Sequence, residues 1–355
     1  MKILLSGGGT MGSVMPLIAI KDDLRSKEAE FLWLGTKNGP ERRVVEKAGV
    51  KFQDISSAKL RRYFSWKTLA APFLFAAGFF QSLLVILKFK PDLILTAGGF
   101  VCVPVAFAGF VLRKRIIVHQ QDLTVGLANK LMAPLASIIT VSLEILKKEF
   151  SEKKTIVIGN PVRKNIFSGS RDSAAERFGL ENGLPVVLVL GGGTGSTAIN
   201  NIINQTLPEL VEFCQVIHVT GPGKNIDFKS QRYHSFEFLN EDLADAYAVA
   251  DLVISRAGFG ALTELSALGK PAILIPLPNK DQIKNSEYFL KHEAAEVLTE
   301  RDLTVRKLKE EIKALIENDP ERQKLSKNIG EILSKNANAS YQAIIEKVTK
   351  TAQKH

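Results

Sequence analysis

Cysteine and histidine are scarce in this chain of 355 residues. The two cysteines, Cys102 and Cys214, each lie inside an apolar stretch, which argues against a disulfide framework and indicates a reducing, cytoplasmic setting. The five histidines are scattered without the spacing of a metal site, so we expect no bound metal and no other cofactor. No secretory signal is evident, because the first residues lead straight into an apolar run and a glycine cluster, which predict an opening strand.

Acidic residues are outnumbered as well: 37 Asp and Glu stand against 47 Lys and Arg, which gives a net charge of +10. Such an excess suits a nucleic acid, an anionic membrane or a phosphorylated substrate. We expect no nucleic-acid partner, because the sequence has no helix-turn-helix pattern, stacking platform or zinc motif. Apolar residues make up 45% and charged residues 24%, a folded globular composition, and the length predicts two domains.

Short apolar runs alternate with longer helical patterns in both halves of the chain. This alternation predicts βαβ units and parallel sheets. The expected fold class is α/β, with two Rossmann-like domains whose parallel sheets face each other across a cleft. The predicted strands are Ile3–Leu5, Phe31–Leu34, Asp92–Thr96, Ile116–Val118 and Ile156–Ile158 in the first half, and Val186–Leu190, Val216–Val219, Leu252–Ser255 and Ile273–Pro276 in the second.

A Gly-Asn-Pro-Val-Arg turn at residues 159–163 marks the predicted boundary between the domains. A polar stretch follows it, as is typical of a linker. The expected organisation is a first domain over residues 1–163, a second over residues 164–340, and a C-terminal helix over residues 341–355 that could pack back on the first domain.

Residues 68–87 contain no charged side chain. At helical rise this run could nearly cross a bilayer, but a single crossing would leave the strands before and after it, which should share one sheet, on opposite sides. Aromatic residues are dense here, and Lys59, Arg61, Arg62, Lys67, Lys88 and Lys90 flank the run. An apolar stretch with cationic flanks is typical of an element that lies in an anionic membrane surface. A buried helix of the first domain is the alternative.

A glycine-rich loop follows the opening strand of each half, at residues 6–13 and at residues 191–196. Glycines let backbone amides approach a phosphate or a sugar, and the start of the following helix favours negative charge. The first loop is not the dinucleotide pattern GxGxxG. Each loop alone is explained by a tight turn, but their matching places in the two halves favour a binding role.

The strongest motif runs from Ser255 to Glu264. A predicted strand ends at Ser255, glycines free the amides, and a helix begins near Phe259, where a diphosphate would lie. Glu264 lies about one turn inside that helix, where its carboxylate can accept hydrogen bonds from ribose hydroxyls; a solvated helix glutamate is the alternative. The polar residues 276–285 after the next strand suit hydrogen bonding to sugar hydroxyls, or form a simple polar loop.

These motifs make the chain resemble the MurG-type family of GT-B glycosyltransferases, which transfer N-acetylglucosamine from UDP-N-acetylglucosamine to lipid I. The resemblance runs from Gly7 to about Ala343. The residues that carry it, in family order, are Gly8-Gly9-Thr10, Gly98-Gly99, His119 with Gln121, Gly159-Asn160-Pro161-Val162-Arg163, Arg256 with Gly258, and Glu264.

The resemblance implies an inverting hexosyltransferase of peptidoglycan and cell wall synthesis, peripheral at the cytoplasmic face of the cell membrane. The second domain would hold UDP-N-acetylglucosamine, with Glu264 on the ribose and Arg163 assisting from the linker. Further donor contacts would come from Gly193, Thr194, Asn240, Phe259, Gly260, Ala261, Leu262, Thr263, Asp281 and Gln282. In the first domain Thr10, Met11 and Gly12 would face the diphosphate of the lipid-linked acceptor, and residues 68–87 stand where the family has its membrane-facing patch.

Several acceptor-side residues depart from the family pattern. Met11 replaces a glycine, Ser13 replaces a histidine and Asp122 replaces an asparagine. Because the Ser13 hydroxyl is too weakly basic to accept a proton unaided, Asp122 and His119 become the candidate catalytic bases, and Asp122 a candidate substrate ligand. The alternatives are that Asp122 caps the next helix and that His119 is structural.

Three other functions remain open at this stage. The enzyme could glycosylate another lipid such as diacylglycerol, or the same architecture could serve a UDP-sugar 2-epimerase. A non-catalytic UDP-sugar-binding protein is the third possibility, because the loop histidine is missing. Release of UDP distinguishes them, since a transferase needs an acceptor, an epimerase makes a new sugar and a binding protein does neither.

Overall fold

The computed structural model describes residues 1–24, 29–57, 71–239, 242–334 and 336–350, and divides the chain into two compact units. The first unit comprises Met1–Arg163 together with Ser334–His355, and the second comprises Lys164–Leu333. The second domain was expected to end at residue 340, whereas the chain leaves the first unit after Arg163 and returns to it at Ser334. There the backbone amide of Val162 donates to Asn338 Oδ1 at 2.9 Å.

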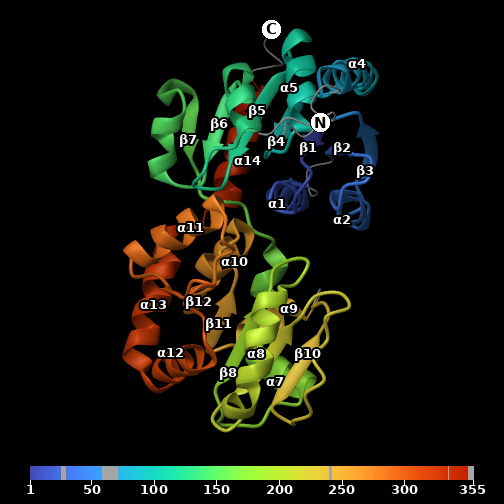
Figure 1. The fold of residues 1–355 in the computed structure, drawn as a ribbon. Helices are drawn as coiled ribbons and strands as arrows, with labels where there is room; N and C mark the ends of the chain where they lie inside the picture. The colour runs from blue at the N-terminus through green and yellow to red at the C-terminus, as the bar shows by residue number, and fades with distance from the viewer. Residues whose placement is uncertain (25–28, 58–70, 240–241, 335, 351–355) are drawn as a thin grey trace. The chain divides into compact units, whose positions relative to one another are not determined.

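The first unit is built on a seven-stranded parallel sheet in the order β3-β2-β1-β4-β5-β6-β7 (Figure 1). The central strands are buried along nearly their whole length, as expected for a sheet with helices on both faces. The strands are β1 (Lys2–Ser6), β2 (Glu30–Thr36), β3 (Lys51–Ile55), β4 (Leu93–Thr96), β5 (Arg115–Gln120), β6 (Ile138–Val141) and β7 (Thr155–Val157).

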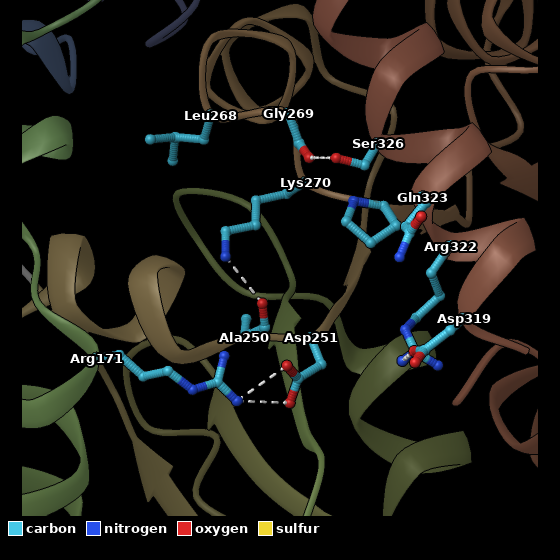
Figure 2. Close-up of a pocket in the computed structure, with 11 residues that line it drawn as sticks. Arg171, Ala250, Asp251, Leu268, Gly269, Lys270, Asp319, Arg322, Gln323 and Ser326 are labelled. Atoms are coloured by element: carbon cyan, nitrogen blue, oxygen red, sulfur yellow. Dashed lines mark hydrogen bonds and ion pairs between the residues drawn. The ribbon is translucent and has the colours of Figure 1, made fainter. Parts of the chain in front are cut away.

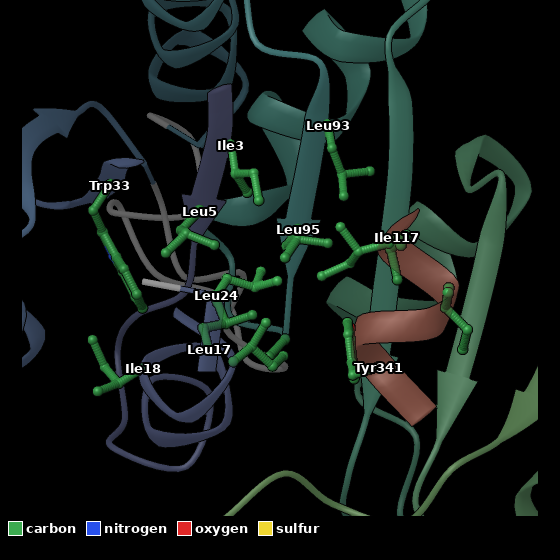
Figure 3. Close-up of a cluster of buried hydrophobic side chains, with 14 of the residues drawn as sticks. Ile3, Leu5, Leu17, Ile18, Leu24, Trp33, Leu93, Leu95, Ile117 and Tyr341 are labelled. Atoms are coloured by element: carbon green, nitrogen blue, oxygen red, sulfur yellow. The ribbon is translucent and has the colours of Figure 1, made fainter. Parts of the chain in front are cut away.

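The C-terminal helix belongs to the core of this unit. Tyr341 of α14 lies among the buried side chains of the sheet and of α1, where Leu5 and Leu95 also pack (Figure 3). The helices are α1 (Met15–Leu24), α2 (Glu41–Lys47), α4 (Ala71–Phe89), α5 (Cys102–Val111), α6 (Leu127–Met132) and α14 (Ala337–Lys350), with short 3₁₀ turns at Ala133–Leu135, Glu144–Glu149 and Glu152–Lys154.

The second unit repeats the architecture with six parallel strands in the order β10-β9-β8-β11-β12-β13. The strands are β8 (Val186–Leu190), β9 (Gln215–Val219), β10 (Tyr233–Phe236), β11 (Leu252–Ser255), β12 (Ala272–Leu274) and β13 (Glu296–Val297). The helices are α7 (Arg171–Phe178), α8 (Thr197–Leu210), α9 (Leu243–Val249), α10 (Phe259–Leu268), α11 (Lys280–Lys291), α12 (Val305–Glu317) and α13 (Asp319–Ile332), preceded by a 3₁₀ turn at Lys164–Ser168. The α/β class with parallel sheets is confirmed.

Both sheets have a point where the strand order reverses. In the first unit it lies between β1 and β4, and in the second between β8 and β11. Ligands of open parallel sheets bind beyond the carboxyl ends of the strands at such points. Both glycine-rich loops and the Ser255–Glu264 motif therefore begin at the places where this architecture puts a ligand.

Helix α4 carries an apolar surface. It packs against α5, and a Cβ atom at Gly78 would lie 3.4 Å from Cγ of Pro104 in α5 and 2.1 Å from the carbonyl oxygen of Ser56 after β3. On its other face Phe73, Phe80 and Leu84 are 78%, 63% and 68% exposed. Among the described residues it is the one helix long and apolar enough to cross a membrane, yet β3 before it and β4 after it lie in one sheet.

The basic residues expected to flank this helix are only partly in view. Lys88 and Lys90, at its C-terminal end, are exposed. Lys59, Arg61, Arg62 and Lys67 lie outside the described residues. The alternative of a buried helix holds for one face of α4 and not for the other.

Candidate functional site

The first glycine-rich loop is held to the sheet through its own backbone. Trp33, buried in β2, donates from Nε1 to the carbonyl oxygen of Gly7 at 3.0 Å. The amide of Gly8 donates to Ser13 Oγ at 3.1 Å, and the amide of Gly9 donates to Glu41 Oε2 at 3.2 Å. These contacts use the polar groups of the loop's first half.

The second half of the loop carries the predicted phosphate-facing residues. The amides of Thr10, Met11 and Gly12 donate to no acceptor in the described part of the chain. They lie just before α1, where a helix leaves its first amides without partners. Thr10 is exposed and Met11 and Gly12 are half-buried, so none of the three residues is enclosed in the core.

Three loops meet at the carboxyl edge of the first sheet. A Cβ atom at Gly99, which has a φ of 96°, would lie 2.3 Å from the carbonyl oxygen of Gly8, so the loop after β4 touches the loop after β1. A Cβ atom at Gly12 would lie 2.8 Å from Gln121 Nε2, in the loop after β5. The structure therefore brings together the glycine pairs and the His119–Asp122 segment.

His119 is fully buried and both of its ring nitrogens are engaged. Nδ1 lies 3.0 Å from Thr140 Oγ1, and Nε2 lies 2.8 Å from Asn160 Oδ1. Burial lowers the pKa of His119 to about 4, so the ring is neutral near neutral pH. This geometry favours the structural role for His119 over that of a catalytic base.

Ser13 forms hydrogen bonds within the first glycine-rich loop. Its hydroxyl is buried and within hydrogen-bond distance of the carbonyl oxygens of Gly8 and Thr10, at 3.3 and 3.2 Å, besides accepting from Gly8. The side chain thus closes the glycine-rich loop on itself. Ser13 anchors the loop, and its position does not suit proton abstraction.

Asp122 is half-buried in the loop after β5. The alternative that it caps α6 is not met, because the N-cap of that helix is Gly126 and no side chain caps it. The loop backbone is held instead by Gln120, whose Nε2 donates to the carbonyl oxygen of Asp122 at 2.6 Å. Of the candidate bases, Asp122 is half-buried, whereas Ser13 and His119 are buried.

In the second unit, the strongest motif adopts the predicted geometry. Helix α10 begins at Phe259 after the N-cap Gly258, and no side chain caps its first amides. Phe259, Leu262 and Thr263 are buried, and Thr263 Oγ1 donates to the carbonyl oxygen of Phe259 at 2.7 Å. Residues 259–263 can therefore meet a ligand mainly through their backbone, with Gly260 and Ala261 half-exposed.

Glu264 is oriented by a residue that the sequence analysis missed. The hydroxyl of Tyr247, in α9, donates to Glu264 Oε2 at 3.0 Å. Tyr247 is buried to 1% exposure, whereas Glu264 is half-exposed. A fixed carboxylate one turn inside α10 is arranged to accept hydrogen bonds from a diol, as a ribose would offer.

Two cations hold the second glycine-rich loop. Arg256 is buried and donates to Ser196 Oγ at 2.6 Å and to the carbonyl oxygen of Ile275 at 3.0 Å, besides pairing with Glu300. Lys224 Nζ donates to the carbonyl oxygens of Thr194 and Gly195 at 3.0 and 3.1 Å. Gly193 and Thr194 themselves are exposed, so the loop tip is open to a ligand.

The polar segment before α11 is tied to the same place. Asn285, fully buried, donates from Nδ2 to the carbonyl oxygen of Ala257 at 3.1 Å. Gln282 accepts from the amide of Leu277 at 2.9 Å, and its Nε2 would lie 3.9 Å from a Cβ atom at Gly258. Asp281 is exposed at the start of α11.

Two of the predicted donor residues lie outside the described part of the second unit. Asn240 lies outside the described residues. Arg163 is half-buried at the last position of the first unit's opening stretch.

A pocket of about 330 Å³ lies at the opposite, amino edge of the second sheet (Figure 2). Its charged groups already have protein partners: Arg171 pairs with Asp251 at 3.0 Å, and Lys270 Nζ donates to the carbonyl oxygen of Ala250 at 2.9 Å. Arg322 pairs with Asp319 in the same wall. We attribute these residues to the anchoring of β11 and β12 rather than to ligand binding.

Over the described ranges, no group of three or more His, Cys, Asp or Glu side chains could hold a metal ion.

Two doubly wound parallel units, each with a glycine-rich loop at its switch point, define the GT-B class of enzymes. The model of the glycosyltransferase family 28 N-terminal domain matches residues 3–141, and that of the family 28 C-terminal domain matches residues 186–345. The chain therefore belongs to glycosyltransferase family 28.

Relatives named for a specific reaction match most of the chain. A Bacillus cereus protein named UDP-N-acetylglucosamine–N-acetylmuramyl-(pentapeptide) pyrophosphoryl-undecaprenol N-acetylglucosamine transferase 2 is 38% identical over 325 residues, which cover 90% of this chain and 92% of the relative. A Clostridium tetani transferase of the same name, without the final numeral, is 36% identical and covers 98% of both chains.

Solved structures match the fold. The crystal structure of Acinetobacter baumannii MurG aligns with a TM-score of 0.76 at 23% identity, covering 98% of this chain and 99% of that one. A Neisseria meningitidis UDP-GlcNAc 2-epimerase bound to UDP-GlcNAc aligns with a TM-score of 0.69 at 16% identity, covering 98% and 100%. Because transferases and epimerases share this architecture, the fold alone does not choose between them.

Proposed function

We propose that this protein transfers N-acetylglucosamine from UDP-N-acetylglucosamine to lipid I, forming lipid II in peptidoglycan synthesis. Two observations together support this proposal: the geometry around Glu264 and the reaction for which the relatives are named. Glu264 is held by Tyr247 one turn inside the uncapped helix α10, and transferases named for this reaction match 90% of the chain or more.

The second unit binds the donor. The diphosphate lies at the start of α10, where the amides near Gly260 and Ala261 and the helix dipole favour negative charge. Glu264 accepts hydrogen bonds from the ribose hydroxyls. The open tip at Gly193 and Thr194 adds contacts to the diphosphate, while Asp281 and Gln282 bind hydroxyls of the sugar. These backbone donors also stabilise UDP as it leaves.

The first unit binds the acceptor. The amides of Thr10, Met11 and Gly12 face the diphosphate of lipid I. An acceptor hydroxyl then attacks the anomeric carbon in a single displacement, which inverts the configuration at that carbon. Asp122 removes the proton of the attacking hydroxyl, since it is the more exposed of the candidate bases, and Ser13 and His119 are buried.

Helix α4 places the enzyme at an anionic membrane surface on the cytoplasmic side. Its exposed Phe73, Phe80 and Leu84 enter the interface, and Lys88 and Lys90 meet the headgroups. The protein remains peripheral, because a crossing at α4 would separate β3 from β4.

Release of UDP from UDP-N-acetylglucosamine tests the proposal. We expect release only when a lipid I analogue is present, and none with diacylglycerol. Release without an acceptor, together with a new hexosamine, would identify an epimerase. UDP-N-acetylglucosamine binding with no release on any lipid, and with the bound sugar recovered unchanged, would identify a binding protein.

A further inference from the structure

Helix α2 brings a carboxylate to the first glycine-rich loop from a distant part of the sequence. Glu41, the first residue of α2, is fully buried. Its Oε2 accepts from the amide of Gly9 at 3.2 Å, and its Oε1 accepts from the amide of Thr36 at 2.7 Å and from the Thr36 hydroxyl. No ion pair joins it to a cation within the described ranges, so these three donors stabilise its charge.

The space around this carboxylate is occupied on two sides by glycines. A Cβ atom at Gly8 would lie 2.5 Å from Glu41 Oε1, and one at Gly39 would lie 2.1 Å from Oε2. The group is therefore clamped between the loop and the turn that follows β2. A shift of the carboxylate would move the backbone at Gly8 and Gly9 with it.

The position of Gly9 determines the direction of the amides that follow it in the loop. Gly9, with a φ of 82°, turns the backbone into Thr10, Met11 and Gly12. The amide of Gly9 is directed inward by Glu41, and the three following amides have no protein acceptor among the described residues. We propose that Glu41 is a positioning residue that holds this loop in the conformation that receives the acceptor's diphosphate. The inference rests on the proposed role of the first unit.

The two carboxylate oxygens allow a selective test. In Glu41→Gln, the side-chain oxygen can point toward Thr36 and keep both hydrogen bonds from that residue. The NH₂ group then faces the amide of Gly9, and because both groups are donors, no hydrogen bond forms between them. Thr36→Val removes only the hydroxyl donor and leaves the Gly9 contact. Glu46→Gln, on the exposed face of the same helix, is the surface control.

Steady-state kinetics and calorimetry on the full chain separate the two substrates. For Glu41→Gln we expect kcat/KM for a lipid I analogue to fall about ten- to a hundredfold, as for loss of a hydrogen bond to a charged group, with UDP affinity unchanged. Thr36→Val and Glu46→Gln should stay within about threefold of wild type. Equal kinetics in Glu41→Gln and Glu46→Gln, or an equal loss of UDP affinity, would overturn the inference.

Hydrogen exchange at the amides of residues 9–12 gives a readout that does not need turnover. We expect the Gly9 amide to exchange at least tenfold faster in Glu41→Gln than in Glu46→Gln, and unchanged exchange would overturn the inference even if the wild type proved inactive on lipid I. If Glu41→Gln does not fold, Gly39→Ala applies the same displacement from outside the loop. It should raise exchange at Gly9 and leave UDP affinity intact, and normal exchange there would equally refute the role.

Discussion

The buried His119 predicts a specific pH dependence of stability in the first unit. Its pKa is lowered from 6.5 to about 4 by burial, so the folded protein keeps the ring neutral where the unfolded chain already binds a proton. Stability contributed by the neutral ring is therefore fully present above pH 6.5 and is lost as the pH falls toward 4. At 1.36 kcal/mol per pH unit, the contribution is about 3 kcal/mol.

His119→Gln removes this titration. At pH 7.5 the variant should be less stable than wild type, because the hydrogen bonds to Thr140 and Asn160 are disturbed. Between pH 6.5 and pH 4, the free energy of unfolding of the wild type should fall by about 3 kcal/mol relative to that of the variant, because only the wild type contains the neutral His119. The contribution of the other buried histidine, His218, cancels because both proteins contain it.

Urea unfolding followed by tryptophan fluorescence is the suitable assay. Both tryptophans, Trp33 and Trp66, lie in the stretch of chain that forms the first unit, so the signal is local to it. Turnover of His119→Gln near neutral pH should remain within about tenfold of wild type, below the 10²–10⁴ expected for loss of a base. A wild-type to variant difference in stability that stays constant from pH 7.5 to pH 4 would refute the reasoning.

Three further outcomes follow from the proposed site. Glu264→Ala should weaken UDP binding more than tenfold, or by about 2 kcal/mol, and Tyr247→Phe should weaken it less. If calorimetry shows unchanged UDP affinity in Glu264→Ala, Glu264 does not bind the ribose. Asp122→Asn should lower turnover of a lipid I analogue by about 10²–10⁴ with UDP binding intact, and full turnover would show that Asp122 is not the base. Leu84→Ser should reduce flotation with anionic vesicles, whereas the same change at the exposed Leu290 of the second unit should not; equal flotation of both variants would count against α4 as the docking surface.

The sequence predicted most of the buried strands and the edge strand β7, but it missed three other edge strands and the interior strand β6. β1, β8 and β11 are apolar runs because helices cover both of their faces, and all three were predicted. β3 and β10 were missed because polar residues interrupt them: Lys51–Ile55 reads KFQDI and Tyr233–Phe236 reads YHSF, so neither forms an apolar run. Strand β13 has only two residues, and β6 is short and closely follows a proline turn, so neither gave a periodic signal.

In the candidate site, features set by contiguous residues were predicted, and contacts between residues far apart in the sequence were not. The glycine loops, the start of α10 and the position of Glu264 depend on neighbours in sequence, and the motif predicted their geometry. The long-range contacts that hold them were not predicted: Glu41 is 32 residues from Gly9, and Arg256 is 60 residues from Ser196. A buried charged side chain has no periodicity that reveals its partner, because the pairing arises from the fold.

The proposed transfer of N-acetylglucosamine to lipid I is tested most directly by the chemical structure of the product. The purified chain is incubated with UDP-N-acetylglucosamine and a lipid I analogue, and the lipid product is analysed by mass spectrometry and NMR. The lipid product should be heavier by one N-acetylglucosamine, linked with the anomeric configuration opposite to that in the donor. An unmodified lipid beside consumed UDP-N-acetylglucosamine, or a sugar attached with retained configuration, would contradict it.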